Sequence, residues 1–422
     1  MRTGVGRSIA MTRVQIGLSY PLEIYKISHP NNFNWLIDQR SPRLLKNHAL
    51  RHKNGDLTVM KIKWSAALLV AVSGVTYAQS SVTLYGIVDT GLSYYNHATA
   101  HGGSEVGVPT LTGEVPSRWG FKGIEDLGGG YKTFFVLESG FQPGTGSLNY
   151  GGRLFGRQAN VGVSSDYGSL TLGRQMNMTM YALTNADVIG PSIHSMASFD
   201  PYLPNSRSDN AVGYLGKFHG VTLGGTYSFG RDAAGPAGPA ATNCGGQVPG
   251  DFVACRQYTA LLAYDSASFG AAASYDVMRG GTGASAPLNN SAYTDTHNIV
   301  DGYVILGPTK IGVGWVRNNV AAATHLQTDI FFAGATYYAT PSFYFDAEGV
   351  RYLQRGPAGK NDANSTLLIG RVNYLISKRT TVYTSVGYMF NSALAANAVA
   401  AGGTVETGAD QLGVMVGLQQ KF

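Results

Sequence analysis

Long stretches of the chain alternate apolar and polar side chains with a period of two. In residues 81–95, alternate side chains fall on two faces. One face is apolar and holds Val82, Leu84, Val88 and Leu92; the other is mainly polar and holds Thr83, Tyr85, Asp89 and Ser93. Successive side chains of a strand point to opposite faces of a sheet, so this segment predicts one long strand. Residues 411–422 alternate in the same way up to Phe422.

The pattern recurs along residues 79–422 and predicts 16 strands. Short turns that contain Gly, Ser or Pro join most strands in pairs, and longer stretches rich in Gly, Ala, Asn and Pro separate the pairs. The predicted pairs cover residues 117–141, 157–175, 210–229, 258–277, 298–319, 327–353 and 366–390.

An even number of antiparallel strands, with short turns at one rim and long loops at the other, is typical of a membrane β-barrel. A soluble sandwich is the alternative, and it would turn the same apolar faces inward. Aromatic residues near strand ends, such as Tyr94, Tyr131 and Tyr352, favour the barrel because aromatic girdles mark the two membrane interfaces. We therefore predict an all-β fold, a 16-stranded antiparallel transmembrane β-barrel with lipid around it and water inside.

One long segment, residues 175–207, lacks the alternation. It contains Pro191, Pro201 and Pro204, together with apolar residues such as Met180 and Phe199 that need packing partners. Loops above roughly 12 to 15 residues are normally functional or disordered. We predict that this loop folds into the barrel and narrows it.

Residues 60–78 have the features of a secretory signal peptide. Lys61 and Lys63 precede an apolar run, and small residues lead to Ala78, which predicts cleavage before Gln79. A membrane helix is the alternative, but the apolar run is shorter than the roughly 20 residues that a spanning helix needs. A signal peptide belongs at the N-terminus, so we interpret residues 1–59 as a leader upstream of a true start at Met60.

Removal of residues 1–78 changes the charge of the chain. Of the 31 basic and 25 acidic residues, 11 and 3 lie there, which leaves 20 and 22, a net charge of −2. The basic pI of the full sequence is therefore no argument for nucleic-acid binding. Cys244 and Cys255 lie in a Gly/Pro-rich stretch of an exported chain, and we predict one disulfide between them, with two free thiols as the alternative.

Four strings within residues 79–422 resemble the trimeric general porins of Gram-negative bacteria, in particular the beta-proteobacterial type. They are SSVTLYGIVDTGLSYY, SRWGFKGIEDLGGG, FGRQANVGVSSDYGSLTLGRQ and the C-terminal VGLQQKF. The resemblance implies a homotrimer in the outer membrane, contact with outer-membrane lipid and lipopolysaccharide, and a third loop that folds inward. It also implies that Phe422 is part of the signal for outer-membrane insertion.

The resemblance further implies a constriction, in which arginines on the wall face acidic groups on the loop. Matching motifs assign Arg118, Arg157 and Arg207 to the wall, although simple alternation would turn Arg157 outward with Val161 unless a bulge intervenes. Asp187 and Asp200 are the acidic residues of the loop, where a cap or Asx-turn is the alternative role. Lys122, Arg153 and Arg174 are additional lumen candidates.

The sequence lacks the HExxH, GxSxG, Walker and GxGxxG motifs, so we expect no enzymatic activity, no metal and no cofactor. Fixed charges across a narrow neck orient solutes and filter ions. We expect passive diffusion of small hydrophilic solutes and ions; a substrate-selective channel and an adhesin are the alternatives. His194 lies in the inward loop, where titration near neutral pH would affect the pore.

Sequencing of the N-terminus of the exported protein tests the processing prediction. We expect the mature chain to begin at Gln79, because the small residues before it suit signal peptidase. A mature chain that retains Asn31 or Arg40 would show that residues 1–59 are part of the protein.

Overall fold

The computed structural model describes residues 81–99, 101–235, 241–355 and 363–422. The predicted leader, residues 1–59, and the predicted signal peptide, residues 60–78, lie outside the described residues. The helices within the described ranges include none long and apolar enough to cross a membrane.

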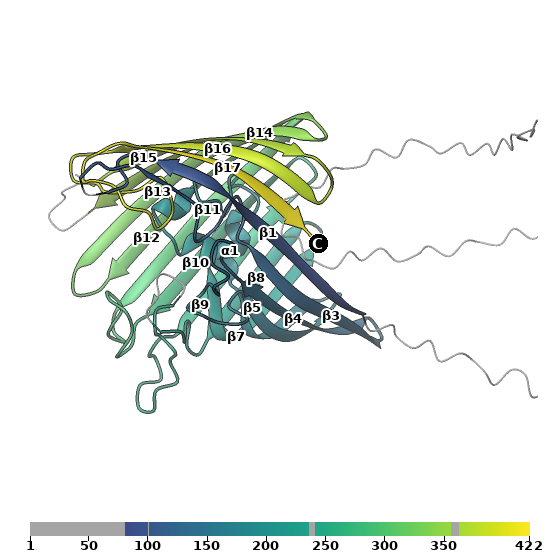
Figure 1. The fold of residues 1–422 in the computed structure, drawn as a ribbon. Helices are drawn as coiled ribbons and strands as arrows, with labels where there is room; N and C mark the ends of the chain where they lie inside the picture. Colours follow the sequence, from purple (N-terminus) through teal and green to yellow (C-terminus); the bar gives the residue numbers. More distant parts are fainter. Residues whose placement is uncertain (1–80, 100, 236–240, 356–362) are drawn as a thin grey trace, which may run out of the picture. The chain divides into compact units, whose positions relative to one another are not determined.

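The regular secondary structure of the described residues is almost entirely antiparallel sheet (Figure 1). Short turns lie at one rim, and longer loops lie at the other, which we call the long-loop rim. The long strands are β1 (Ser81–Tyr95), β3 (Arg118–Gly128), β4 (Tyr131–Gly140), β5 (Gln158–Ser165), β6 (Gly168–Met176), β7 (Arg207–Phe218), β8 (Val221–Ser228), β9 (Gln257–Asp265), β10 (Phe269–Arg279), β11 (Thr294–Leu306), β12 (Thr309–Ala321), β13 (His325–Thr340), β14 (Phe343–Arg355), β15 (Ser365–Leu375), β16 (Thr380–Asn391) and β17 (Gln411–Lys421).

Each long strand pairs with its neighbour in sequence, and β1 closes the sheet by pairing with both β3 and β17. Ile87 faces Arg118 on one side and Lys421 on the other. The predicted 16-stranded antiparallel barrel is confirmed. The prediction missed β2 (Glu105–Gly107), a short strand that pairs with β1 inside a long loop.

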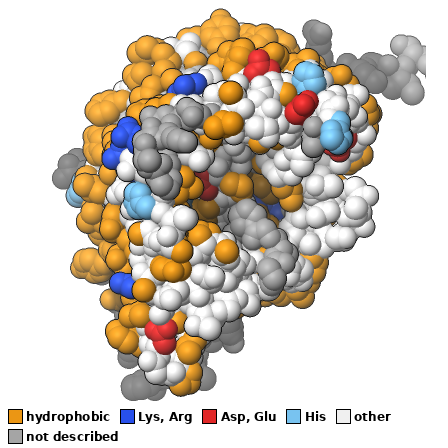
Figure 2. Space-filling view, turned by 90° about the vertical axis from the view of Figure 1, so that its left-hand side faces the viewer, with side chains coloured by type: hydrophobic (Ala, Val, Ile, Leu, Met, Phe, Trp, Pro, Cys, Tyr) orange, Lys and Arg blue, Asp and Glu red, His pale blue; other side chains and the backbone are white. Residues whose placement is uncertain are grey.

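The two faces of the strands differ as the alternation predicted. On β1, the side chains of Val82 and Leu92 are both 67% exposed on the outer face, whereas Asp89 is 1% exposed on the inner face. On β17, Val416 is 52% exposed and Gln419 is 3% exposed. Figure 2, which views the long-loop rim, shows hydrophobic side chains along much of the outer edge. The apolar face therefore points out of the barrel, which rules out a dry sandwich core.

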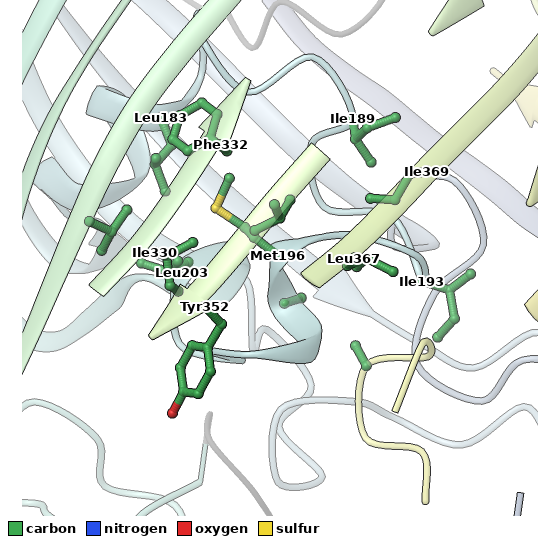
Figure 3. Packing of buried hydrophobic residues seen from close by; sticks show 14 of the residues in the cluster. Leu183, Ile189, Ile193, Met196, Leu203, Ile330, Phe332, Tyr352, Leu367 and Ile369 are labelled. Atoms are coloured by element: carbon green, nitrogen blue, oxygen red, sulfur yellow. The ribbon is translucent and has the colours of Figure 1, made fainter. Parts of the chain in front are cut away.

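The segment between β6 and β7, residues 177–206, contacts buried residues of β10, β11, β15 and β16, and we call it the inner loop. It contains the helix α1 (Met178–Leu183) and the 3₁₀ turns η1 (Met196–Ser198) and η2 (Leu203–Asn205). Its apolar side chains join buried residues of β11 to β15 in one cluster (Figure 3). Phe199 also stacks on Tyr352 with ring centroids 5.0 Å apart.

Candidate functional site

Three buried arginines meet at the inner wall: Arg118 of β3, Arg157 before β5, and Arg207 at the start of β7. We call them the arginine cluster. Arg157 donates from Nε to Glu138 Oε1 at 2.6 Å and from a terminal nitrogen to the Tyr150 hydroxyl at 2.6 Å. Arg207 donates to the carbonyl oxygen of Arg157 at 2.9 Å, and its guanidinium lies 5.2 Å from the Tyr150 ring centroid. Arg118 Nε lies 3.8 Å from Glu138 Oε2. The structure thus brings together the three wall arginines that the motifs assigned.

The electrostatics of this cluster favour an excess of positive charge. Three guanidinium groups surround one carboxylate, Glu138, so the group carries a net charge of +2 when Tyr150 is neutral. Burial opposes the charge of Arg157, but Tyr150 and Glu138 outweigh it, and the pKa of Arg157 lies above its ordinary value. Burial raises the pKa of the Tyr150 hydroxyl, but Arg157 and Arg207 outweigh burial and lower that pKa. Fixed cations of this kind attract anions in a narrow, water-poor space.

Arg157 points inward without a bulge. Its backbone N–H donates to the carbonyl oxygen of Glu138, and strand β5 begins at the next residue, Gln158. The β4–β5 register runs without a shift, and Val161 is 51% exposed on the outer face. Alternation within β5 therefore does not apply to Arg157, because that residue precedes the strand.

The two acidic residues of the inner loop accept hydrogen bonds from the loop backbone. Asp187 accepts from the N–H groups of Ile189 at 3.1 Å and Gly190 at 2.7 Å. Burial raises the pKa of Asp187. Asp200 accepts from the N–H of Tyr202 at 3.0 Å, and its other oxygen lies 2.8 Å from His297 Nε2 of β11. Both carboxylates thus shape the loop as Asx-turns do, and Asp200 also holds the loop to the wall.

Arg371 of β15 was not predicted from the sequence; it is 2% exposed and contacts the inner loop. It donates to Asp346 at 2.9 Å and to the carbonyl oxygen of Ile189 at 3.1 Å, and it lies 3.5 Å from Glu114. Burial raises the pKa of Glu114 to about 7, although Arg371 acts in the opposite direction. The alternating pattern of this strand could have identified Arg371 as an inward-facing residue. Arg371 falls on the same face as the polar Asn373, whereas Leu368 falls on the other face.

Glu138, which lies between the wall arginines, was not predicted from the sequence either. Glu138 faces Gly120 in the β3–β4 register, and Arg118 faces Gly140. Directly opposite residues share a face of the sheet, so both charged side chains point inward. The strand pairing set by the predicted turn at residues 125–130 could have placed Glu138 on the same face as Arg118.

The additional lumen candidates have separate surroundings. Lys122 Nζ lies 5.5 Å from the Tyr85 ring centroid. Arg153 pairs with Asp209 at 3.0 Å and also with Asp232. Arg174 pairs with Asp209 and donates to the carbonyl oxygen of Gly156 at 2.6 Å.

Phe422 continues the backbone pairing between β1 and β17, which closes the barrel. Its backbone N–H donates to the carbonyl oxygen of Gly86 at 3.1 Å, and its own carbonyl oxygen accepts from Gly86 at 3.1 Å. Its side chain is 49% exposed. The role of Phe422 in membrane insertion stays a prediction.

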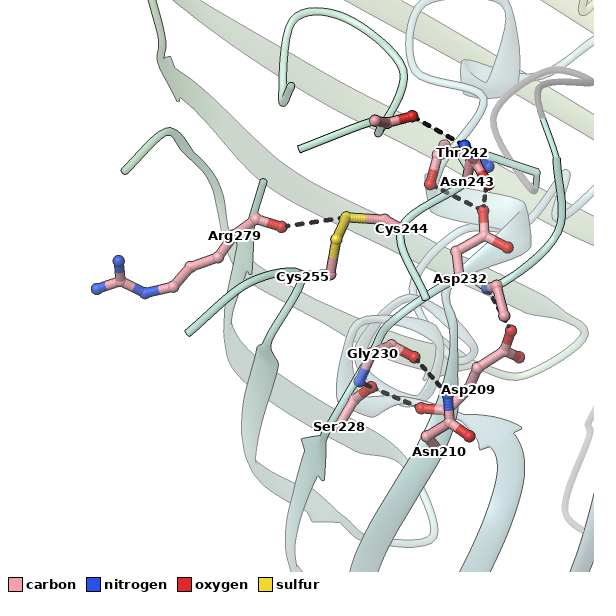
Figure 4. The surroundings of a disulfide bond; sticks show 12 residues. Asp209, Asn210, Ser228, Gly230, Asp232, Thr242, Asn243, Cys244, Cys255 and Arg279 are labelled. Atoms are coloured by element: carbon pink, nitrogen blue, oxygen red, sulfur yellow. Dashed lines mark hydrogen bonds between the residues drawn. A yellow bond between two sulfur atoms is a disulfide. The ribbon is translucent and has the colours of Figure 1, made fainter. Parts of the chain in front are cut away.

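Cys244 and Cys255 form a disulfide in the loop between β8 and β9 (Figure 4). Both are buried, at 0% and 3% exposure. The backbone of Asp232 exchanges hydrogen bonds with Cys244, and the Arg231 N–H donates to the carbonyl oxygen of Cys255 at 3.0 Å. The disulfide therefore ties the first residues of this loop to its last ones.

The expectation that His194 titrates near neutral pH is wrong. The imidazole is 0% exposed and lies 3.1 Å from the Tyr95 hydroxyl and 3.0 Å from the Ser385 hydroxyl. Burial lowers the pKa of His194 to about 4, because no facing carboxylate compensates for lost hydration. His194 is a neutral link between the inner loop and strands β1 and β16.

Comparison with known proteins gives one consistent family. Residues 65–394 match the family described as Gram-negative porin. The outer membrane porin protein 32 of Delftia acidovorans is 30% identical over 378 residues, which cover 86% of this chain and 100% of that protein. An outer membrane porin protein of Bordetella pertussis is 33% identical over 299 residues, which cover 65% of this chain and 71% of that protein. The solved structure of the anion-selective porin from Comamonas acidovorans matches with a TM-score of 0.67 at 25% identity, covering 82% of this chain and 100% of that chain.

The buried, neutral His194 predicts a specific loss of stability in acid. Its folded pKa of about 4 lies below the ordinary value of 6.5, so the stabilisation is complete above pH 6.5 and is lost as the pH falls from 6.5 to 4. At about 1.4 kcal/mol per pKa unit, the full loss is roughly 3 kcal/mol. Thermal unfolding of the wild type and of His194→Gln, followed by circular dichroism in detergent, measures the effect. Glutamine does not titrate, so the gap between the two melting temperatures should change across this window; parallel pH profiles would contradict the assignment.

Proposed function

The chain belongs to the Gram-negative porin family, and on that premise we propose that it forms a water-filled channel for passive diffusion of small hydrophilic solutes and ions. The protein is an outer-membrane β-barrel. The observation that carries the proposal is the orientation of the strands, whose polar side chains line the inside while apolar ones face outward. A polar interior within a closed barrel permits water and dissolved solutes to pass.

We further propose that residues 175–207 form the constriction and that Arg118, Arg157 and Arg207 are its basic wall. The inner loop contacts inward-facing residues of β10, β11, β15 and β16, which supports a position inside the barrel. Asp187 and Asp200 contribute negative charge on the loop, in addition to their backbone contacts. Residues 60–78 act as the signal peptide in this proposal, and residues 79–422 form the barrel.

The ion preference that we propose is for anions. The arginine cluster contains three cationic side chains around one carboxylate. The structural relative named as an anion-selective porin shares 25% of its sequence with this chain. A fixed positive group at a narrow point raises the local concentration of anions and lowers that of cations.

The assembly that we propose is a homotrimer surrounded by outer-membrane lipid and lipopolysaccharide. Large apolar residues such as Leu84, Leu262 and Leu418 are more than half exposed on the outer wall of the single chain. An apolar surface of this extent leads to aggregation in water. Membrane lipid or the wall of a second barrel covers it without exposing apolar side chains to water.

A substrate-selective channel, an adhesin and a barrel enzyme remain the competing functions. An adhesin would act through its outer loops, and an enzyme would need catalytic groups at the rim. The curated relatives are named as porins, which supports a channel without catalytic activity. Stepwise conductance in planar bilayers separates the channel from the adhesin and the enzyme.

Reversal potentials in a KCl gradient test the anion preference. We expect the wild type to prefer chloride and Arg157→Gln to lose that preference several-fold, because one charge at an effective dielectric constant of about 20 and a distance of roughly 15 Å contributes on the order of 1 kcal/mol. Glu138→Gln should shift the reversal potential in the opposite direction. Arg351→Gln is the matched control, because Arg351 is exposed on the outer wall and donates to Thr366 at 2.7 Å. Identical reversal potentials for wild type, Arg157→Gln and Glu138→Gln would exclude the arginine cluster as the selectivity element.

A further inference from the structure

A group of charged side chains lies on the outer wall of β12 to β14, close to the long-loop rim. Trp315 of β12 faces Phe331 of β13, which is 46% exposed on the outer wall. The next outward pair toward the rim is Arg317 with Asp329. Directly opposite residues share a face of the sheet, so both of these side chains point outward. Arg355, the last residue of β14, has the same orientation.

Asp329 brings the two arginines together, and we call Arg317, Asp329 and Arg355 the outer triad. Arg317 donates from Nε to Asp329 Oδ1 at 2.8 Å and from a terminal nitrogen to Oδ2 at 3.3 Å. Arg355 Nε lies 3.5 Å from the same Oδ2. The Trp315 indole N–H donates to Oδ1 at 2.9 Å. These neighbours cover Asp329, whose side chain is only 1% exposed although it points away from the lumen.

The arginines of the outer triad stay accessible from outside the barrel. The side chain of Arg317 is 37% exposed and that of Arg355 is 55% exposed. A guanidinium carries five N–H donors, and Asp329 accepts from two of those of Arg317. Because both guanidinium groups contact one carboxylate, their remaining donors lie close enough together to meet a single further acceptor.

The charge on this part of the wall is positive and local. Within the described residues, Arg317, Arg351 and Arg355 carry three positive charges here and Asp329 carries one negative charge, a net charge of +2. The outward positions of β11 on one side, and of β15, β16 and β17 on the other, have no charged side chain. An anionic group outside the barrel would therefore be attracted to this part of the wall.

The position of the outer triad fits the lipid head groups of the outer leaflet. Long loops of outer-membrane barrels are extracellular, and a lipid-facing arginine is unfavourable at the bilayer centre but tolerated near an interface. Tryptophan is enriched at the same level. The Trp315 ring centroid lies 5.0 Å from the Arg317 guanidinium, so both residues mark one interface. Figure 2 shows Lys and Arg side chains among hydrophobic ones at the outer edge of this rim.

We propose that the outer triad binds a phosphate group of lipopolysaccharide. Guanidinium groups bind phosphate oxygens through paired hydrogen bonds, and two such groups meet here. Exposed apolar side chains nearer the middle of the wall, such as Phe331 and Leu368, are available to the acyl chains of the same molecule. The site rests on the proposed assembly in outer-membrane lipid and lipopolysaccharide, and it names the residues through which one lipid is held.

Binding of fluorescent lipid A, the phosphorylated anchor of lipopolysaccharide, tests the proposal by fluorescence anisotropy. The full-length protein is purified free of lipopolysaccharide and titrated in detergent micelles, where the wild type should bind with a defined half-saturating concentration. The double variant Arg317→Gln with Arg355→Gln should raise that concentration roughly tenfold, the equivalent of about 1.4 kcal/mol. Arg317→Lys with Arg355→Lys keeps both charges but loses the paired hydrogen bonds, so it should restore only part of the affinity.

Arg279→Gln is the matched control on the outer wall. Arg279 is the last residue of β10, shares its face with the 45% exposed Tyr275, and donates to the carbonyl oxygen of Ser291 at 3.4 Å. This variant removes one charge from the same rim without touching the outer triad, so it should bind lipid A as the wild type does. Circular dichroism checks that every variant folds. Dephosphorylated lipid A should bind equally to the wild type and to the double Gln variant.

The possible failures are distinguishable. Equal half-saturating concentrations for the wild type and the double Gln variant would overturn the site, and equal weakening by Arg279→Gln would reduce it to a general charge effect of the rim. Displacement of lipid A by equal concentrations of inorganic phosphate or phosphatidylglycerol would overturn lipopolysaccharide as the specific occupant. A wild type that binds no lipid A would refute the proposed lipopolysaccharide contact itself, whereas absence of stepwise conductance would refute only the channel.

Discussion

Pairing of the backbone is the constraint on which the whole structure depends. In lipid, each unpaired N–H or C=O group costs several kcal/mol, so a sheet that spans the membrane has no tolerable edge. The contacts of β1 with both β3 and β17 remove the edges, and the backbone hydrogen bonds of Phe422 with Gly86 continue the closing ladder to the last residue. Once the sheet is closed, alternation alone sorts apolar side chains to the outside and polar ones to the inside.

The inner loop contacts side chains on the inner faces of several strands of the closed barrel. On its apolar side, the loop packs against Ile330, Phe332 and Leu367, all at most 3% exposed. On its polar side, separate links hold it: Asp200 to His297, Thr179 to Asp276 at 2.8 Å, and His194 to Ser385. Because both kinds of contact reach several strands, the loop is held at many points rather than hinged at its two ends.

The same arrangement separates charge across the interior. Arginines gather on the wall formed by β3 to β7, and each is supported by fixed partners such as Tyr150 and Glu138. Asp187 of the inner loop and Glu348 of β14 lie near Arg371 of β15. Asp200 of the inner loop pairs with His297 of β11. In the channel that we propose, such preorganised charges act on an ion without rearrangement of the protein.

The sequence by itself determined the strands, their order, their two faces and the one segment that could not be a strand. These features follow from a local rule, the period of two, which each strand obeys independently of its neighbours. Only the tertiary structure decided the surroundings of the loop and the site. β13 to β15 bury apolar side chains on their inner face, as at Ile330 and Leu367, because a loop distant in sequence covers them. The neutrality of His194, the inward turn of Arg157 and the links made by Arg371 likewise depend on groups brought together across the barrel, and no local pattern encodes those meetings.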